Sequence, residues 1–216
     1  AGGMPIDPVV LLDGCNTLYL CAPAHEQRRL RPLFTALATE VLDAAFARAA
    51  RRGRPLDPPL LVVLDEAANV APLAELDALA STAAGHGVQL VTVWQDLAQL
   101  TARYGARAGS VVNNHRVKLF LSGIADPATL EHASTLIGDT EQRQRTTTFD
   151  GRGGRSTSEG PVYRRLAPSD VLRRLPPGTA VAISGHLPPV RFRLRPWWRC
   201  CTLRARATGD AVPKRH

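Results

Sequence analysis

The sequence contains no apolar run long enough to cross a membrane, no signal-peptide pattern and no cysteine pattern of a metal or disulfide site. No stretch approaches the roughly 18 consecutive apolar residues of a transmembrane helix. The opening AGGMPIDPVV has neither a basic nor an apolar signal region. Its four cysteines form no C-x-x-C pair and have no histidine at metal spacing. We therefore expect reduced thiols, and nothing supports secretion.

Lysine is scarce although the chain is strongly basic. Of 27 basic residues only Lys118 and Lys214 are lysines, and the formal net charge is +8. Clustered positive charge is typical of proteins that bind phosphate backbones. A genome rich in GC would produce the same excess of arginine and alanine. Both interpretations stay open, although arginine is concentrated in the second half of the chain.

Strand-like and helix-like segments alternate over the first 138 residues. Apolar runs predict strands, and apolar residues at helical spacing predict helices between them. Strands that are apolar on both faces and alternate with helices indicate an α/β fold with a mostly parallel sheet covered by helices on both faces. At 216 residues the chain can form one domain, with or without an appendage. The strands are expected at 16–23, 60–65, 88–94 and 116–123, and the longer helices at 30–51 and 73–84. Asp126 followed by Pro127 predicts the start of a further helix, which Gly138 ends.

This rhythm stops near residue 139. Residues 139–160 are polar, glycine-rich and unpatterned, which predicts a flexible loop. Residues 161–198 predict a short helix and two strands that complete the domain, and the basic tail 199–216 is expected to be disordered. Trp197 and Trp198 are expected to cover an edge of the core, with stacking on bases as the alternative.

Two adjacent carboxylates follow the apolar run LLVVL. Asp65 and Glu66 come where a buried strand would normally end in a turn residue. In α/β sheets, catalytic and ligand-binding residues commonly lie at the carboxyl ends of parallel strands. In P-loop nucleotide hydrolases an Asp in this place holds Mg²⁺, and a neighbouring carboxylate can activate a water. The alternative is that both residues only cap the next helix.

The next predicted strand, QLVTVW, ends in a polar amide. Gln95 follows this strand and should lie at the same edge of the sheet as Asp65. An amide there can sense a γ-phosphate or the attacking water. The alternative is again a helix cap, but Asp96 already fills that place.

With these motifs in this order, the chain resembles the coupling-protein ATPases of conjugation and type IV secretion, of the VirD4/TraG/TraD kind. The resemblance is carried by residues 60–105, residues 111–138 and the segment from Leu166 to Trp197. The upstream NTLYLCAPAHEQRRLRPLF is similar to the actinobacterial branch. The resemblance as a whole covers most of the chain and corresponds to the C-terminal part of the family's motor domain.

The resemblance implies a RecA-like motor domain that forms a homo-hexamer and hydrolyses ATP with Mg²⁺. Asp65 would be the Walker B Asp that holds Mg²⁺ through water, Glu66 the catalytic Glu and Gln95 the sensor amide. An arginine usually reaches the neighbouring subunit's nucleotide, for which the candidates are Arg103, Arg107 and Arg116. The implied partners are DNA, expected to be single-stranded, relaxosome proteins and the secretion channel, at the cytoplasmic face of the cell membrane.

One family motif is absent from these residues. No G-x-x-x-x-G-K-[ST] phosphate loop occurs in the 216 residues. We therefore expect the chain to be the C-terminal part of a longer protein whose phosphate loop and membrane helices lie upstream, and to be inactive as an ATPase by itself. A non-catalytic DNA-binding module, or a docking module that lost the phosphate loop, remain as alternatives.

Overall fold

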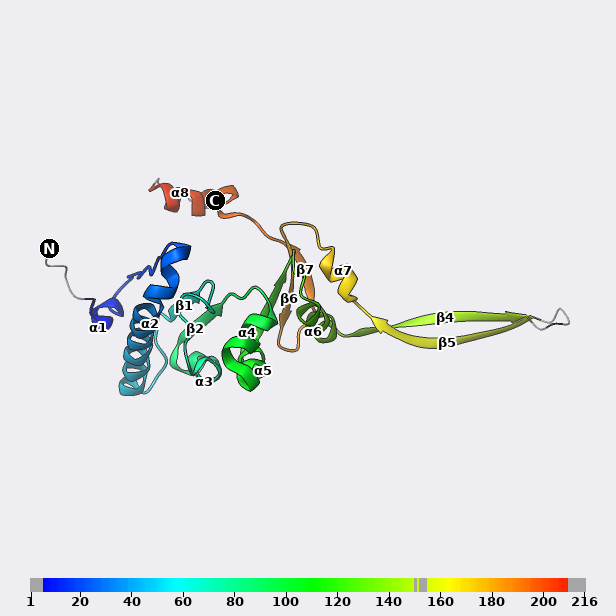
Figure 1. Ribbon diagram of the computed structural model, residues 1–216, viewed down its shortest axis with the longest axis horizontal. Coiled ribbons are helices and arrows are strands. Elements are labelled where there is room, and N and C mark those ends of the chain that lie inside the picture. Colours follow the sequence, from blue (N-terminus) through cyan, green and yellow to red (C-terminus); the bar gives the residue numbers. More distant parts are fainter. Residues whose placement is uncertain (1–5, 150, 152–154, 210–216) are drawn as a thin grey trace. The chain divides into compact units, whose positions relative to one another are not determined.

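The computed structural model describes residues 6–149, 151 and 155–209 (Figure 1). The chain forms two compact units that meet in sequence between Arg116 and Val117, whereas the sequence predicted one domain made of residues 1–138 and completed by residues 161–198. The first unit contains α1 (Pro8–Leu11), α2 (Ala24–Arg52), β1 (Leu60–Leu64), α3 (Leu76–Thr82), η1 (Ala83–His86), β2 (Val88–Thr92), α4 (Leu97–Tyr104), η2 (Gly105–Arg107) and α5 (Ala108–Asn114). The second contains β3 (Val117–Leu121), α6 (Pro127–Ile137), β4 (Asp139–Phe149), β5 (Arg155–Arg165), α7 (Ser169–Arg173), β6 (Thr179–Ser184), β7 (Val190–Arg193), η3 (Trp197–Arg199) and α8 (Cys201–Thr208).

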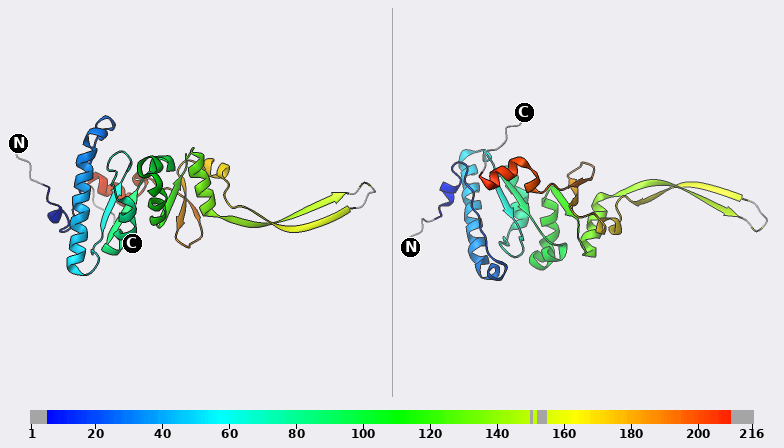
Figure 2. Two further views of the ribbon diagram at one scale, coloured as in Figure 1. Left: turned by 60° about the horizontal axis from the view of Figure 1, so that its bottom comes forward. Right: turned by 90° about the horizontal axis from the view of Figure 1, so that it is seen from above.

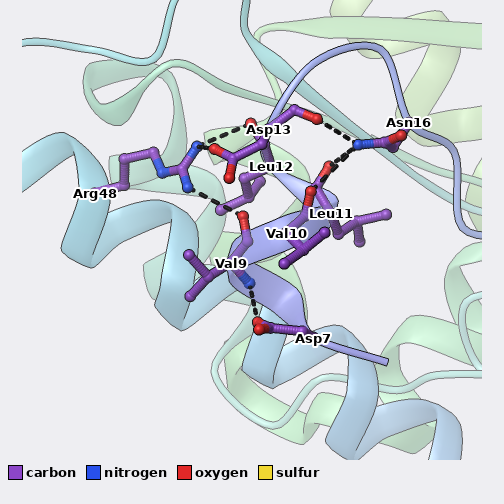
Figure 3. Close-up of polar contacts among 8 residues, drawn as sticks. All are labelled: Asp7, Val9, Val10, Leu11, Leu12, Asp13, Asn16 and Arg48. Carbon is purple, nitrogen blue, oxygen red and sulfur yellow. Dashed lines mark hydrogen bonds and ion pairs between the residues drawn. The ribbon is translucent and has the colours of Figure 1, made fainter. Parts of the chain in front are cut away.

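An arginine on α2 holds the short helix α1 in place. Arg48 donates hydrogen bonds to the carbonyl oxygens of Val9 (3.0 Å) and Leu12 (2.9 Å) and pairs with the carboxylate of Asp13 at 2.7 Å (Figure 3). The side-chain amide of Asn16 donates to further carbonyl oxygens at the end of this helix. The bonds to Arg48 fix the first described segment against α2.

The segment 16–23, predicted to be a strand, has no regular secondary structure. Its apolar side chains Leu20 and Ala22 still pack against the core of the first unit, while Tyr19 is exposed. The prediction was wrong because no strand among the described residues pairs with this segment, and an apolar run without a ladder partner remains irregular.

Helix α2 begins earlier than the sequence predicted. It starts at Ala24, so Pro32 lies inside the helix and not in its first turn. The acidic Glu26 in the first turn favours this earlier start, because a negative charge stabilises a helix N-terminus. The buried face of α2 carries Phe34, Val41, Leu42, Ala45 and Ala49.

Strands β1 and β2 are parallel, with Leu60 opposite Val88 and Leu64 opposite Thr92. Leu60, Val62 and Leu64 alternate into the core of the unit, which α2, α3, α4 and α5 complete. The residues between them, such as Leu61, are exposed. The α/β class is therefore confirmed, while among the described residues the predicted cover of helices is present on one face of this strand pair.

The sheet of the second unit is antiparallel. β6 lies between β3 and β7 and pairs antiparallel with both. The short connection from β6 to β7 explains one of these pairings, since parallel neighbours need a long crossover. Helix α6 starts as predicted, with the Asp126 carboxylate accepting from the Thr129 N–H at 2.8 Å and Pro127 in the first turn. Parallel pairing is thus confined, among the described strands, to β1 and β2.

The stretch 139–160 is not the flexible loop that the sequence predicted. Apart from the turn residue Gly151, its described residues belong to β4 and β5, which pair antiparallel over their full length as a two-stranded ribbon (Figure 2). Arg145 lies opposite Glu159, and at the base of the ribbon Arg165 pairs with Asp139 at 3.6 Å. The ribbon is polar on both faces, so it lacks the apolar alternation by which strands are recognised. Residues 150 and 152–154 of the predicted loop lie outside the described residues.

The C-terminal segment is also more ordered than predicted. The tail expected to be disordered contains α8, although residues 210–216 lie outside the described part. Trp197 and Trp198, which were predicted to cover an edge of the core, are 49% and 57% exposed and belong to neither core cluster of the described residues. No helix among the described residues is long and apolar enough to span a bilayer.

Candidate functional site

The two carboxylates lie where the parallel strands β1 and β2 end. The ladder continues past the strands, because the Val93 N–H donates to the Leu64 carbonyl (3.0 Å) and the Ala67 N–H donates to the Val93 carbonyl (3.2 Å). Asp65 and Glu66 sit between these two bonds, which hold them beside the segment that leads to Gln95. This strand-end position is the one predicted from the sequence.

The backbone at Glu66 turns in the left-handed region, with φ of 49°. This conformation is uncommon for a residue with a side chain and costs on the order of 1 kcal/mol or more. The turn is held because the N–H groups of Asn69 (2.8 Å) and Val70 (3.1 Å) both donate to the Glu66 carbonyl. The Glu66 N–H itself donates to the Asp65 carboxylate at 3.1 Å.

The alternative that Asp65 and Glu66 cap the next helix does not hold. Helix α3 begins only at Leu76, after a segment of turns, and no side chain caps its first residue. The Asp65 carboxylate accepts from the neighbouring Glu66 N–H and from no helical N–H among the described residues. Both carboxylates are exposed and thus available to a ligand.

A cavity of about 210 Å³ opens at this edge of the strands. It brings together Asp65, Glu66 and Gln95, the three residues that the sequence placed there. Asn69 and Gln99, which were not predicted from the sequence, also line the cavity. The spacing of four residues between Gln95 and Gln99 was the only available signal for Gln99.

Gln99 and Asp96 fix the turn that carries Gln95. The side-chain oxygen of Gln99 accepts from the Gln95 N–H at 3.1 Å, and the Asp96 carboxylate accepts from the Gln99 N–H at 2.8 Å. Asp96 is thus the N-cap of α4, as predicted. The Gln95 side chain is not needed to cap α4 and is therefore available to contact a ligand in the cavity.

An aromatic residue, Trp94, forms part of the cavity wall. Trp94 lines the cavity and packs edge-to-face against Tyr104, with ring centroids 5.9 Å apart. The buried Tyr104 hydroxyl donates to the Leu73 carbonyl at 3.0 Å. The Trp94 indole N–H donates to the Thr92 hydroxyl at 2.9 Å, and the ring nitrogen Nε2 of His115 lies 3.2 Å from the same oxygen. These bonds link the wall to α4, α5 and the segment before α3.

We expect Tyr104→Phe to lower the free energy of unfolding by roughly 1–2 kcal/mol, because the buried Leu73 carbonyl loses its donor. Burial raises the pKa of Tyr104 above its ordinary value of 10.0. Because the folded state favours the neutral hydroxyl, its contribution to the free energy of unfolding is complete below pH 10. This contribution is lost as the pH rises through the folded-state pKa.

Urea titrations at neutral pH and above pH 10 measure both effects. The matched control is Tyr19→Phe, which removes the same hydroxyl from a side chain that is 80% exposed and should leave stability unchanged. Equal effects of the two substitutions would contradict the role of the Tyr104 hydroxyl.

Two of the three predicted arginine-finger candidates contact the segment before α3. Arg103 donates to the Pro72 carbonyl at 3.3 Å. Arg107 pairs with the carboxylates of Glu75 (3.2 Å) and Asp77 (3.1 Å). Arg116 is exposed and forms no ion pair among the described residues. Of the three, Arg116 is the one whose guanidinium is not already used to hold this unit together.

The residues of the cavity fit a nucleotide-bound Mg²⁺ only in part. Magnesium prefers oxygen ligands and is often held by one or two carboxylates together with substrate phosphates. Asp65 and Glu66 offer such oxygens, and Gln95 and Asn69 add amides. In the part of the chain that the structure describes, no group of three or more His, Cys, Asp or Glu side chains could hold a metal ion alone. The cavity thus offers carboxylate oxygens of the kind that suit Mg²⁺, and the sequence contains no glycine-rich loop that would cradle phosphates.

Comparison with known protein families matches residues 59–177 to the family described as the TraM recognition site of TraD and TraG. The match covers more than half of the chain and includes the whole cavity. The chain belongs to the TraG/TraD family. The resemblance recognised in the sequence is thereby confirmed.

A curated relative supports this assignment. The chain is 32% identical over 145 residues to the conjugal transfer protein TraG of Rhizobium radiobacter. The aligned part is 64% of this chain but only 22% of that protein. This TraG/TraD-family chain thus spans about a fifth of the relative's length.

Solved structures confirm the fold. The bacterial conjugative coupling protein TrwBdeltaN70, in a trigonal form with sulphate, matches with a TM-score of 0.70 and 22% identity over 88% of this chain and 43% of that one. The plasmid coupling protein TrwB in complex with ADP and Mg²⁺ matches with a TM-score of 0.61 and 24% identity over 79% of this chain and 38% of that one. The chain therefore shares, over most of its length, the α/β fold of part of these coupling proteins.

Proposed function

We propose that this chain supplies the metal-binding carboxylate, the general base and the sensor amide of an ATP-driven coupling protein of conjugation. The observation that carries the proposal is the single cavity that Asp65, Glu66 and Gln95 line at the ends of two parallel strands. The family match and the complex of TrwB with ADP and Mg²⁺ support a nucleotide as the ligand.

Each of the three side chains has a separate task in the proposed site. Mg²⁺, when bound with the nucleotide, would neutralise phosphate charge, and the Asp65 carboxylate would hold it through water. The Glu66 carboxylate accepts a proton from the attacking water and orients it. The Gln95 amide donates to or accepts from the γ-phosphate or that water. In a regular strand, the side chains of two consecutive residues point to opposite faces. The left-handed turn at Glu66 instead allows the carboxylates of Asp65 and Glu66 to line the same cavity.

The phosphates are held, in this proposal, by residues outside these 216. The sequence contains no glycine loop with the lysine that cradles β- and γ-phosphates. The curated relative is several times longer than the aligned part, which leaves room for such a loop in the family. We infer that the activity belongs to a longer protein in which this chain is the C-terminal portion.

The same proposal includes the assembly and its partners. The active form would be a homo-hexamer, with Arg116 as the best-placed candidate to reach a neighbouring nucleotide. It would deliver DNA or protein to a type IV secretion channel at the cytoplasmic face of the membrane. The family description names a TraM recognition site, which supports a relaxosome-type protein as a partner of residues 59–177.

We expect Asp65→Asn to raise the Mg²⁺ concentration for half-maximal ATP turnover roughly ten- to a hundredfold, because an amide replaces the charged oxygen that orders the metal's ligands. The assay uses the chain expressed together with the family's phosphate-loop portion and varies Mg²⁺ at saturating ATP. The control Asp43→Asn removes an exposed carboxylate of α2 and should leave the Mg²⁺ dependence unchanged. An unchanged dependence in Asp65→Asn would refute the metal role.

We also expect the 216 residues alone to hydrolyse no ATP above background, since they contain no phosphate loop. A phosphate-release assay on the purified chain, with and without Mg²⁺, measures this. Turnover that disappears in Glu66→Gln would show that the chain is catalytic by itself and would overturn the proposed division of the site.

A further inference from the structure

A second hollow lies in the second unit, between the turn before β6 and the segment that follows β7. It measures about 450 Å³ and is lined by Gly178, Thr179, Arg193, Trp198 and Arg199, among others. The Leu194 N–H donates to the Gly178 carbonyl at 2.7 Å and ties its two sides together. We name it the Trp198 groove. None of its residues belongs to the carboxylate cavity.

The groove is positively charged. No Asp or Glu occurs between Val171 and Gly209, a stretch that contains eight arginines. Arg193 and Arg199 form no ion pair with a carboxylate among the described residues. Arg195 donates to the Arg199 carbonyl at 2.8 Å, which fixes the end of η3 beside the groove. Unpaired guanidinium groups in a segment without acids are suited to bind phosphates.

The groove also presents aromatic surface. Trp198 is 57% exposed and meets Trp197 edge-to-face, with centroids 5.8 Å apart and planes at 86°. Large aromatic side chains are usually buried, so two half-exposed tryptophans beside arginines need a reason. The contact with Trp197 restricts the motion of the Trp198 ring, which stays 57% exposed and is therefore accessible for stacking.

We propose that the Trp198 groove binds single-stranded nucleic acid, with a base on the Trp198 ring and the flanking phosphates on Arg193 and Arg199. Proteins that bind single strands combine a positive groove with aromatic side chains in this way. A duplex fits poorly, because its bases are paired and stacked and cannot reach the ring. An acidic peptide would satisfy the arginines but leave the exposed ring without a partner. This proposal rests on the proposed function only in that DNA is the expected cargo of a coupling protein.

Binding of a labelled oligothymidylate of about 12 nucleotides to the 216-residue chain tests the proposal by fluorescence anisotropy, without ATP or Mg²⁺. We expect Trp198→Ala to weaken binding roughly tenfold or more, and Trp198→Phe, which keeps an aromatic face, to restore part of the loss. Replacing Arg193 and Arg199 together by Ala should weaken binding and lower the slope of log K against log salt by about 1.4.

The double variant Arg143→Ala with Arg145→Ala is the matched control, because it removes two exposed arginines from the ribbon of the same unit. It should have a clearly smaller effect than the groove variant. Circular dichroism verifies that every variant is folded. Equal effects of the two double variants, or binding of duplex as tightly as single strand, would overturn the proposal. So would an absence of binding, or binding of polyglutamate with the same dependence on Trp198. Because neither nucleotide nor Glu66 takes part, such a failure would leave the proposed hydrolytic function standing.

Discussion

Glu66→Gln is expected to lower ATP turnover roughly a hundredfold or more while ATP affinity remains nearly unchanged. Gln keeps the size and shape of the side chain but cannot accept a proton from the attacking water. Ground-state binding depends mainly on the phosphate loop and the metal, neither of which this change touches. The measurement is steady-state turnover, together with direct nucleotide binding, in the chain expressed with the family's phosphate-loop portion.

The control for this experiment is Glu40→Gln, which makes the same chemical change on the exposed side of α2. Its turnover should equal that of the unaltered protein. Undiminished turnover in Glu66→Gln would remove Glu66 from the mechanism. A parallel loss of ATP affinity would instead indicate that Glu66 serves binding, since a loss shared by ground state and transition state is uniform binding energy.

Gly87→Ala is expected to lower the free energy of unfolding by about 3 kcal/mol or more, a large part of the stability of an ordinary domain. Gly87 has a φ of 77°, and a Cβ there would lie 2.4 Å from the backbone nitrogen of Leu56. The Gly87 carbonyl accepts from the Leu60 N–H at 2.9 Å, and the Leu56 N–H donates to the His86 carbonyl at 3.0 Å. A methyl group at residue 87 would push the segment that leads into β1 away from β2. The folded state would then be strained and would lose these hydrogen bonds.

Gly85→Ala is the matched control only two residues away. A Cβ at Gly85 would meet no atom within 4 Å, and its φ lies outside the left-handed region. This substitution should change stability by less than about 0.5 kcal/mol. Urea unfolding followed by circular dichroism compares the two variants. Equal stabilities would show that the close approach of Gly87 to Leu56 is not needed for the pairing of β1 with β2.

Most of the candidate site could be predicted from the sequence because it depends on local order. An apolar run that ends in Asp65, followed by a second run that ends before Gln95, predicts two strand ends at one edge. The structure places both ends on the same cavity. Asn69 was missed because it lies on an irregular turn, where spacing does not indicate which way a side chain points.

The clearest error concerns the ribbon β4–β5. Its residues are polar on both faces, so neither an apolar alternation nor a helical period was available as a signal. What makes these segments strands is their pairing with each other, residue by residue, from Asp139 opposite Arg165 onward. Such pairing is a property of two segments together, and a window along one of them does not contain it.

The sequence by itself determined the family, the α/β class, the helix caps at Asp96 and Asp126, and the order of acids and amide at the strand ends. These features depend on neighbouring residues, whose preferences are nearly independent of the rest of the chain. Only the tertiary structure decided the antiparallel sheet of the second unit, the left-handed turn at Glu66 and the exposure of Trp198. Each of these depends on which distant segment supplies a hydrogen-bond or packing partner, and the physical rules of local sequence carry no information about that choice.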